Sequence, residues 1–151
     1  MVDPVSRIGF AMALPGKRSK YSAEVLKALL EGNPEIKYFL TDNGSEFQGE
    51  FDRLLREKGI RHYWTYPNSP KMNAHNERFN RTLQEQFVDY HEDLLFTDLE
   101  EFNRRLAEWL VDYNTVLPHH SLGLKPPVKW LMENYPECQR YWTNTSPCLT
   151  L

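Results

Sequence analysis

The sequence predicts an α/β fold in which short apolar strands alternate with amphipathic helices. Two apolar runs, residues 36–41 and 60–65, have the length and the aliphatic and aromatic content of short strands. Four longer segments carry apolar residues at helical spacing, namely residues 22–31, 49–58, 76–90 and 98–113. Glycine follows the first two of these helices, as is common at helix ends. With 151 residues, the chain is long enough for one domain with a hydrophobic core.

The composition restricts the class of protein. Hydrophobic residues make up 40% of the chain and aromatic residues 13%, which indicates a globular rather than a disordered protein. No apolar run approaches the roughly 18 residues of a membrane span, and no charged-then-apolar leader opens the sequence. We therefore expect a cytoplasmic protein without a membrane partner, in which Cys138 and Cys148 are free thiols.

The N-terminal region predicts a hairpin followed by a helix. Residues 1–3 have the character of a strand end, and the next three residues form a turn with Asp3 at its start. Residues 7–14 form the second strand of this hairpin. Ser22 is the expected N-cap of the helix that follows.

A carboxylate lies at the exit of the next strand. Asp42 directly follows the apolar run at residues 36–41, and Asn43 and Gly44 then break the extended backbone. In the helix after this turn, the side chains of Phe51, Leu54 and Leu55 are expected to face inward.

A second carboxylate follows a polar loop. Residues 66–73 are rich in proline and asparagine, and they place Glu77 in the first turn of the helix at residues 76–90. One face of this helix is apolar, with Phe79, Leu83 and Phe87. Another face is polar and carries Glu77, Asn80, Arg81 and Gln84. That face suits a nucleic-acid backbone, and an ordinary solvated helix face is the alternative.

The C-terminal third continues the core. The helix at residues 98–113 has an apolar stripe typical of packing, made of Leu99, Phe102, Leu106, Trp109, Leu110 and Tyr113. Pro126 and Pro127 open a last short helix. We therefore expect residues 1–134 to form a folded core with a C-terminal helical extension, and residues 135–151 to form an irregular tail.

Asp42 and Glu77 suggest a metal site. One helix and one strand lie between them, which is enough for the chain to fold back and bring the two carboxylates together. Carboxylates that converge in this way bind divalent cations through hard oxygen ligands. Two such ions about 3.5–4 Å apart cleave and join phosphodiesters.

Several motifs then make a specific family resemblance. TDNGSEF is followed by LLREKGIRHYW, by YPNSPKMNAHNERFNRTLQEQF and finally by YNTVLPHHSLGLKPPVKWL. In this order they resemble the catalytic core of DDE transposases and retroviral-type integrases, and most closely the bacterial insertion-sequence transposases with an integrase core domain. The resemblance extends over residues 3–131.

The resemblance implies a ribonuclease-H-like fold, which is a five-stranded mixed sheet flanked by helices. Against that pattern, this chain lacks the first strand and most of the second. The resemblance therefore implies that residues 1–134 are an N-terminally truncated, partial integrase catalytic core with unpaired strand edges. The family needs two aspartates and a glutamate, of which Asp42 matches the second and Glu77 the third. Asp3 lies at the hairpin turn and does not match the first, so this chain alone is expected to be inactive.

The resemblance also implies the chemistry and the partners. Asp42 and Glu77 would be catalytic ligands of two Mg²⁺ or Mn²⁺ ions that promote phosphodiester cleavage and strand transfer. The partners would be DNA, both transposon ends and target, and further copies of the chain in a homo-oligomer. The residues that would contact DNA are Asn43, Lys71, Asn73, Asn80 and Arg81.

The charge distribution is compatible with DNA, although the net charge is −3. Residues 53–81 contain seven basic and two acidic residues, whereas residues 85–112 contain two basic and nine acidic ones. A positive field therefore surrounds the expected site. Two ordinary solvated helix faces remain the alternative explanation.

Other patterns are weaker. His119, His120, Cys138 and Cys148 do not have the spacing of a zinc site, because the histidines are adjacent and no Cys-x-x-Cys pair is present. His62 and His75 have no assigned role. The aromatic residues Tyr63, Trp64 and Tyr66 could stack on bases, but an aromatic strand end is more often core.

Two other functions remain open. The chain could be an inactive transposase remnant that binds DNA or a full-length transposase. It could also be a metal-dependent nuclease of the same fold. The YNTVLPHHSLG motif argues against a nuclease, because this motif resembles that of transposases.

Overall fold

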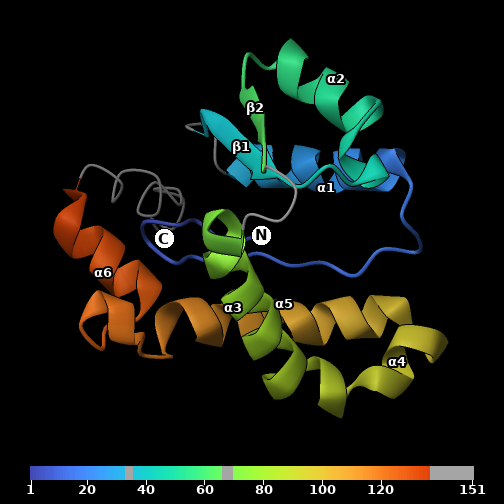
Figure 1. Cartoon of the computed structure of the whole chain (residues 1–151). Helices are drawn as coiled ribbons and strands as arrows, with labels where there is room; N and C mark the ends of the chain where they lie inside the picture. The colour runs from blue at the N-terminus through green and yellow to red at the C-terminus, as the bar shows by residue number, and fades with distance from the viewer. Residues whose placement is uncertain (33–35, 66–69, 137–151) are drawn as a thin grey trace, which may run out of the picture.

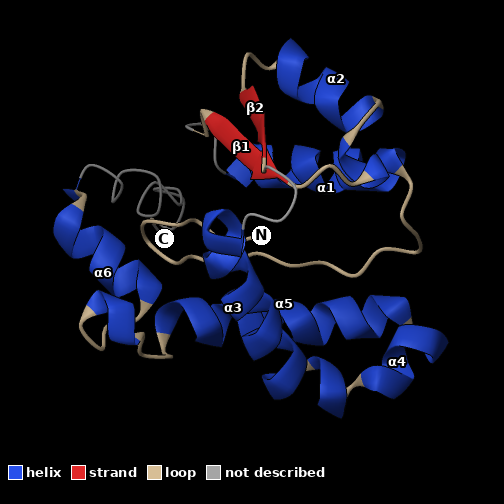
Figure 2. Cartoon of the chain, viewed as in Figure 1, coloured by secondary structure: helices blue, strands red, loops and turns tan. Residues whose placement is uncertain are grey.

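The computed structural model describes residues 1–32, 36–65 and 70–136. Its two strands are β1 (Tyr38–Thr41) and β2 (Arg61–Trp64). Its α-helices are α1 (Ser19–Gly32), α2 (Glu50–Glu57), α3 (Pro70–Gln86), α4 (Glu92–Thr97), α5 (Leu99–Thr115) and α6 (Pro127–Asn134). Short 3₁₀ turns are η1 (Ser45–Phe47), η2 (Val88–Tyr90) and η3 (His120–Leu122). Figures 1 and 2 show the sheet with α1 and α2 in the upper part of the molecule and α3, α4 and α5 in the lower part.

The sheet has two parallel strands, and α2 forms the crossover between them. Phe39 pairs with His62, and Thr41 pairs with Trp64 at the carboxyl end. Phe39 and Thr41 are buried, whereas the alternate residues of β1 are exposed. The strand therefore turns one face toward α1 and α2 and ends directly before Asp42.

The first hydrophobic cluster lies between the sheet, α1 and α2. Phe51 is fully buried at its centre, with its ring centroid 6.0 Å from that of Phe39 and 5.3 Å from that of Phe47. Leu54 and Leu55 are also buried, so the predicted inward face of this helix is confirmed. This cluster supports the strand that carries Asp42.

The second cluster lies between α3 and α5. Phe79 of α3 and Phe87, which directly follows α3, are buried against Phe102, Leu106 and other residues of α5. The apolar faces predicted for both helices are therefore confirmed. At the start of α5, the Asp98 side chain accepts a hydrogen bond from the backbone N–H of Glu101, which caps the helix.

The N-terminal hairpin differs from the expectation of two strands. Val2 and Gly9 form a single antiparallel bridge, and residues 7–14 do not form a regular strand. Two side-chain amides from α5 take the place of a neighbouring strand. Asn114 exchanges two hydrogen bonds with Gly9 (2.8 and 2.9 Å), and Asn103 exchanges two with Ala13 (2.8 and 3.0 Å). The backbone N–H and carbonyl groups of Gly9 and Ala13, which lie in a strand expected to have an unpaired edge, are thus hydrogen-bonded to asparagine side chains.

Two helix starts also differ from the prediction. α1 begins at Ser19, so Ser22 lies inside the helix rather than at its N-cap. α3 begins at Pro70, six residues before the predicted start. Proline is favoured in the first turn of a helix because its fixed φ suits the helix and its missing N–H is not needed there.

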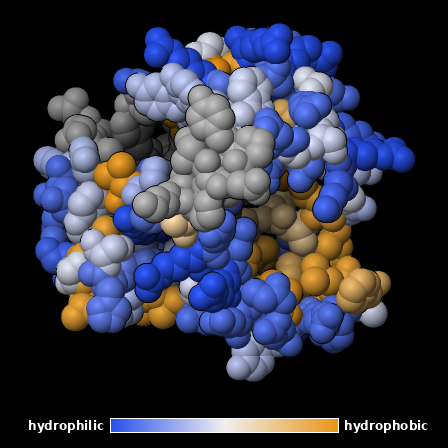
Figure 3. Space-filling model, in the orientation of Figure 1, coloured by the Kyte–Doolittle hydropathy of each residue, from blue (hydrophilic) through white to orange (hydrophobic). Residues whose placement is uncertain are grey.

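The fold class is the predicted α/β one, in which the described sheet is small. None of the helices in the described part of the chain is long and apolar enough to cross a membrane. On the face shown in Figure 3, strongly hydrophilic side chains cover the region of α3, and apolar ones gather at the right of the view.

Candidate functional site

Asp42 lies where the sequence predicts it, at the carboxyl end of β1. Its side chain is exposed, and Oδ1 accepts a hydrogen bond of 3.0 Å from the backbone N–H of Gly44. A Cβ atom at Gly44 would lie 3.0 Å from that oxygen and 2.7 Å from Oε2 of Glu46. Two carboxylates therefore approach the same glycine. The sequence analysis did not select Glu46, although it lies within the TDNGSEF motif.

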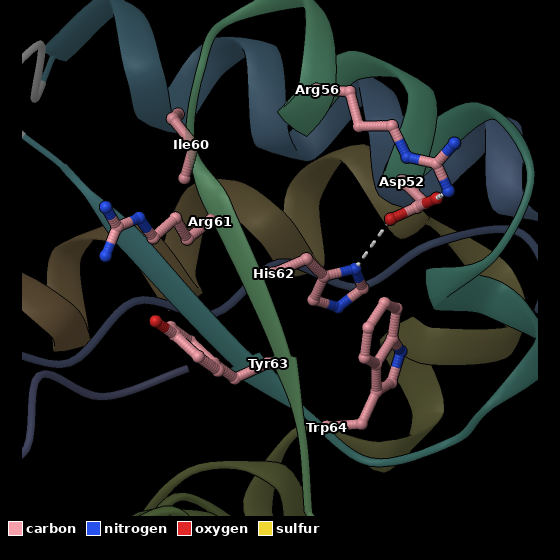
Figure 4. A pocket seen from close by; sticks show the side chains of 7 residues that line it. All are labelled: Asp52, Arg56, Ile60, Arg61, His62, Tyr63 and Trp64. Atoms are coloured by element: carbon pink, nitrogen blue, oxygen red, sulfur yellow. Dashed lines mark hydrogen bonds and ion pairs between the residues drawn. The ribbon is translucent and has the colours of Figure 1, made fainter.

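A buried hydrogen-bond network reaches the backbone of Asp42 from α2. Oδ1 of Asp52 lies 3.1 Å from Nδ1 of His62, and Nε2 of His62 lies 2.8 Å from Oγ1 of Thr41. Oγ1 of Thr41 lies 2.9 Å from the carbonyl oxygen of Asp42. The His62 side chain is only 4% exposed and that of Asp52 14%. Figure 4 shows both residues, with Arg56 on the outer side of Asp52.

The direction of these hydrogen bonds follows from the acceptor at Asp52. A carboxylate only accepts hydrogen bonds, so Nδ1 of His62 carries a hydrogen. The single hydroxyl hydrogen of Thr41 then goes either to the Asp42 carbonyl or to Nε2 of His62. His62, which the sequence analysis left without a role, is therefore a fully partnered histidine between α2 and the end of β1.

These side chains also line an open hollow of about 360 Å³ beside β2. Figure 4 shows His62 and Trp64 on one side of the strand and Arg61 and Tyr63 on the other. Trp64 is 44% exposed, so the alternative that this strand end is simply core does not hold for its side chain.

Replacing Asp52 by alanine is expected to lower the free energy of unfolding by about 2 kcal/mol, because it leaves the buried Nδ1–H of His62 without an acceptor. Urea denaturation would measure this loss. Arg56→Ala is the matched control, since the Arg56 side chain is 76% exposed and an exposed ion pair contributes about 0–1 kcal/mol. Equal losses for the two variants would show that the surface ion pair, and not the buried histidine, is what Asp52 stabilises.

Glu77 lies on α3, but not in its first turn. It is the eighth residue of the helix, because the helix begins at Pro70, and its side chain is exposed. Asn80 and Arg81 are exposed on the same helix, and Asn43 is exposed beside Asp42. The predicted polar face of α3 is confirmed as an exposed face.

Lys71 and Asn73 belong to the first turn of α3 rather than to a loop. The loop prediction was wrong at these two positions because the helix extends back to the proline. Their side chains lie outside the described part of the structure, as do residues 66–69 of the predicted loop.

The described residues do not form a complete metal site. No group of three or more histidine, cysteine, aspartate or glutamate side chains in residues 1–32, 36–65 and 70–136 is arranged to hold a metal ion. Asp42 and Glu77 are two carboxylates, whereas two divalent ions need more oxygen ligands than these supply. Of the weak zinc set, Cys138 and Cys148 lie outside the described residues, and the ring of His119 packs edge-on against Tyr113 at 4.8 Å.

Comparisons with known proteins agree with the motifs and the fold. Residues 58–127 match the family "Integrase core domain". Over 57 residues the chain is 39% identical to the retrovirus-related Pol polyprotein from transposon TNT 1-94 of Nicotiana tabacum, which is 37% of this chain and 4% of that protein. The chain thus spans only a small part of that curated relative.

Solved structures show the same fold. The catalytic core domain of BIV integrase matches with a TM-score of 0.71 and 22% identity, over 93% of this chain and 86% of that one. A simian T-cell lymphotropic virus intasome, solved with the PP2A regulatory subunit B56 gamma, matches with a TM-score of 0.69 and 21% identity, over 99% of this chain and 48% of that one. Residues 58–127 therefore match the integrase core domain family, and the structure has the predicted ribonuclease-H-like fold of integrase catalytic cores.

Proposed function

We propose that the chain acts in DNA integration or transposition, in a core that cleaves and joins phosphodiester bonds with divalent metal ions. The observation that carries this proposal is the placement of two acids within the family fold. Asp42 lies at the carboxyl end of β1, and Glu77 lies on α3 within the matched residues 58–127. The similar proteins, which are an integrase, an intasome and a transposon polyprotein, support the same function.

In this proposal Asp42 and Glu77 are two carboxylate ligands of Mg²⁺ or Mn²⁺. When bound, such ions activate an attacking hydroxyl and stabilise the charge that develops on the phosphodiester. The backbone N–H of Gly44 orients the Asp42 carboxylate. In this proposal the exposed side chains of Asn43, Asn80 and Arg81 contact DNA, and Lys71 and Asn73 at the start of α3 add to this surface.

Two carboxylates hold a metal pair poorly, so we expect the 151-residue chain by itself to bind metal weakly and not to join DNA. Further copies of the chain in an oligomer on DNA complete the proposed assembly. The second candidate is an inactive protein that binds DNA or a full-length transposase, and the incomplete set of ligands among the described residues favours it.

The shared metal site can be tested with Mn²⁺, which broadens the NMR signals of nearby residues. We expect Mn²⁺ to broaden the amide signals around Asp42 and around Glu77 together. If one ion is shared, Asp42→Asn abolishes the broadening at both places, and so does Glu77→Gln. Glu57→Gln, at an exposed acid of α2, is the control and should change neither. Loss of broadening only at the mutated residue would contradict a shared site.

The activity itself is tested by incubating the chain with a labelled DNA duplex end and Mn²⁺. Joined or nicked product that disappears in both Asp42→Asn and Glu77→Gln would establish a catalytic core. DNA binding without product is what we expect of this chain by itself, and the shared Mn²⁺ broadening then decides between a metal-binding core and an inactive DNA-binding protein. Absence of both DNA binding and shared Mn²⁺ broadening would refute the proposed function.

A further inference from the structure

Four segments that are distant in sequence meet where the N-terminal hairpin contacts the helices. Gly9 of the hairpin exchanges two hydrogen bonds with Asn114 of α5. The ring of Phe79 on α3 lies 5.1 Å from that of Tyr113 on α5, and Tyr113 lies 4.8 Å from the ring of His119. We call Gly9, Phe79, Tyr113, Asn114 and His119 the hairpin junction.

Two arginines flank the hairpin junction. Arg7 lies two residues before Gly9, with its Nε 3.4 Å from Oγ of Ser121 and its guanidinium bonded to the carbonyl of Pro4. Its φ is +64°, which is unusual for a residue other than glycine. Arg78 is the neighbour of Phe79 on α3 and has an exposed side chain.

Both guanidinium groups act on the same rings. Burial lowers the pKa of His119, and the charges of Arg78 and Arg7 lower it further. Burial raises the pKa of Tyr113, and the same two arginines oppose that rise. The charges of Arg7 and Arg78 therefore both reach the contacting rings of Tyr113 and His119.

Neither arginine has a carboxylate partner among the described residues, and the same holds there for Arg18, Arg61 and Arg81. Arg104 pairs with Glu101 and Glu108, and Arg53 pairs with Glu57, but neither Arg7 nor Arg78 makes an ion pair within the described ranges. The attraction of Arg104 and Arg105 even lowers the pKa of Glu101 to about 2. Two cations without a carboxylate partner, one on each side of the hairpin junction, favour binding of an external anion, and the guanidinium group matches phosphate in shape.

We propose that Arg7 and Arg78 form a phosphate-binding site for the sugar-phosphate backbone of DNA, beside the hairpin junction. Arg78 lies beside the Glu77 and Arg81 face of α3, because residues three positions apart are neighbours on a helix surface. Ser121 offers a hydroxyl beside Arg7 as a further donor. The choice of DNA as the source of the phosphate rests on the proposed function, whereas anion binding at this site does not.

The test measures the affinity of the full chain for a short labelled DNA duplex between about 50 and 200 mM salt. Each lost phosphate contact lowers the slope of log K against log salt by about 0.9. We expect Arg7→Gln with Arg78→Gln to lower that slope by about two units. Arg53→Gln removes the same kind of charge from an arginine that is 70% exposed and paired with Glu57, and it should leave the slope nearly unchanged.

An unchanged slope in the double variant, or an equal loss in Arg53→Gln, would overturn the site while leaving the proposed function in place. If Arg7→Gln prevents folding, Arg78→Gln alone decides, with an expected loss of about 0.9. If the chain does not bind DNA at all, an NMR titration with inorganic phosphate separates the two proposals. Shifts around Arg7, Arg78 and Ser121 that vanish in the Arg78→Gln variant would support the anion site and reject DNA as its ligand, and no shifts would reject the site.

Discussion

Replacing Gly9 by alanine is expected to lower the free energy of unfolding by about 3 kcal/mol, at the upper end of the usual cost of overpacking a core. A Cβ atom at this position would lie 2.4 Å from Cε2 of Phe79 and 2.9 Å from Cε1 of Tyr113. Both rings are buried, with exposures of 2% and 5%. The backbone of Gly9 cannot move away easily, because Asn114 binds both its N–H and its carbonyl.

Chemical denaturation of the variant measures this loss, and Gly16→Ala is the matched control. A Cβ atom at Gly16 would meet only the Tyr21 ring at 3.9 Å, which is an ordinary contact. We expect this control to change stability by less than about 1 kcal/mol, since alanine mainly restricts the unfolded chain there. If Gly9→Ala costs no more than Gly16→Ala, the two rings have room to shift and the hairpin junction is not tightly packed.

The parts of the fold that the sequence predicts well are those governed by local periodicity. The apolar run before Asp42 becomes β1, and the spacing of Phe51, Leu54 and Leu55 becomes the buried face of α2. Asp42 emerges at the strand end because Asn43 and Gly44 stop the extended backbone. In each case the signal lies within a few residues of the feature.

The start of α3 was missed for a local reason. The prolines and asparagines of residues 66–73 resemble a loop, but Pro70 is compatible with the first turn of a helix, and the helix begins there. The error moves Glu77 from the first turn to the middle of α3 and moves Lys71 and Asn73 onto the helix. The choice of Glu77 as a candidate metal ligand is unaffected, because it rests on the motif and not on the position of Glu77 in the helix.

Long-range contacts could not be predicted from one sequence. Residues 7–14 have strand-like composition, yet their partners are the amides of Asn103 and Asn114, about 100 residues away. Nothing near His62 in the sequence indicates that Asp52 and Thr41 enclose it. Arg7 likewise reaches Ser121 only because the chain folds the hairpin onto the C-terminal region.

Replacing Asn114 by alanine is expected to cost about 3 kcal/mol of the free energy of unfolding, because the N–H and the carbonyl of Gly9 both lose their partner. Gly9 is buried, so water cannot readily take the place of the amide, and each unsatisfied buried group costs about 1–3 kcal/mol. Asn103→Ala removes the same two bonds from Ala13, which is only partly buried. We expect a loss of about 1 kcal/mol there, since water can replace the amide.

Chemical denaturation of the two asparagine variants measures both losses of unfolding free energy. Their comparison shows whether the loss depends on the burial of the bonded backbone groups or only on the number of hydrogen bonds removed. Equal losses would mean that the bonds themselves, and not the exclusion of water at Gly9, determine the stability of the hairpin. Asn114→Asp adds a third comparison, because a carboxylate can accept from the N–H of Gly9 but cannot donate to its carbonyl. We expect it to fold less stably than the natural chain. Because Gly9 lies two residues from Arg7, Asn114→Ala should also weaken DNA binding at the arginine pair, although it removes no charge.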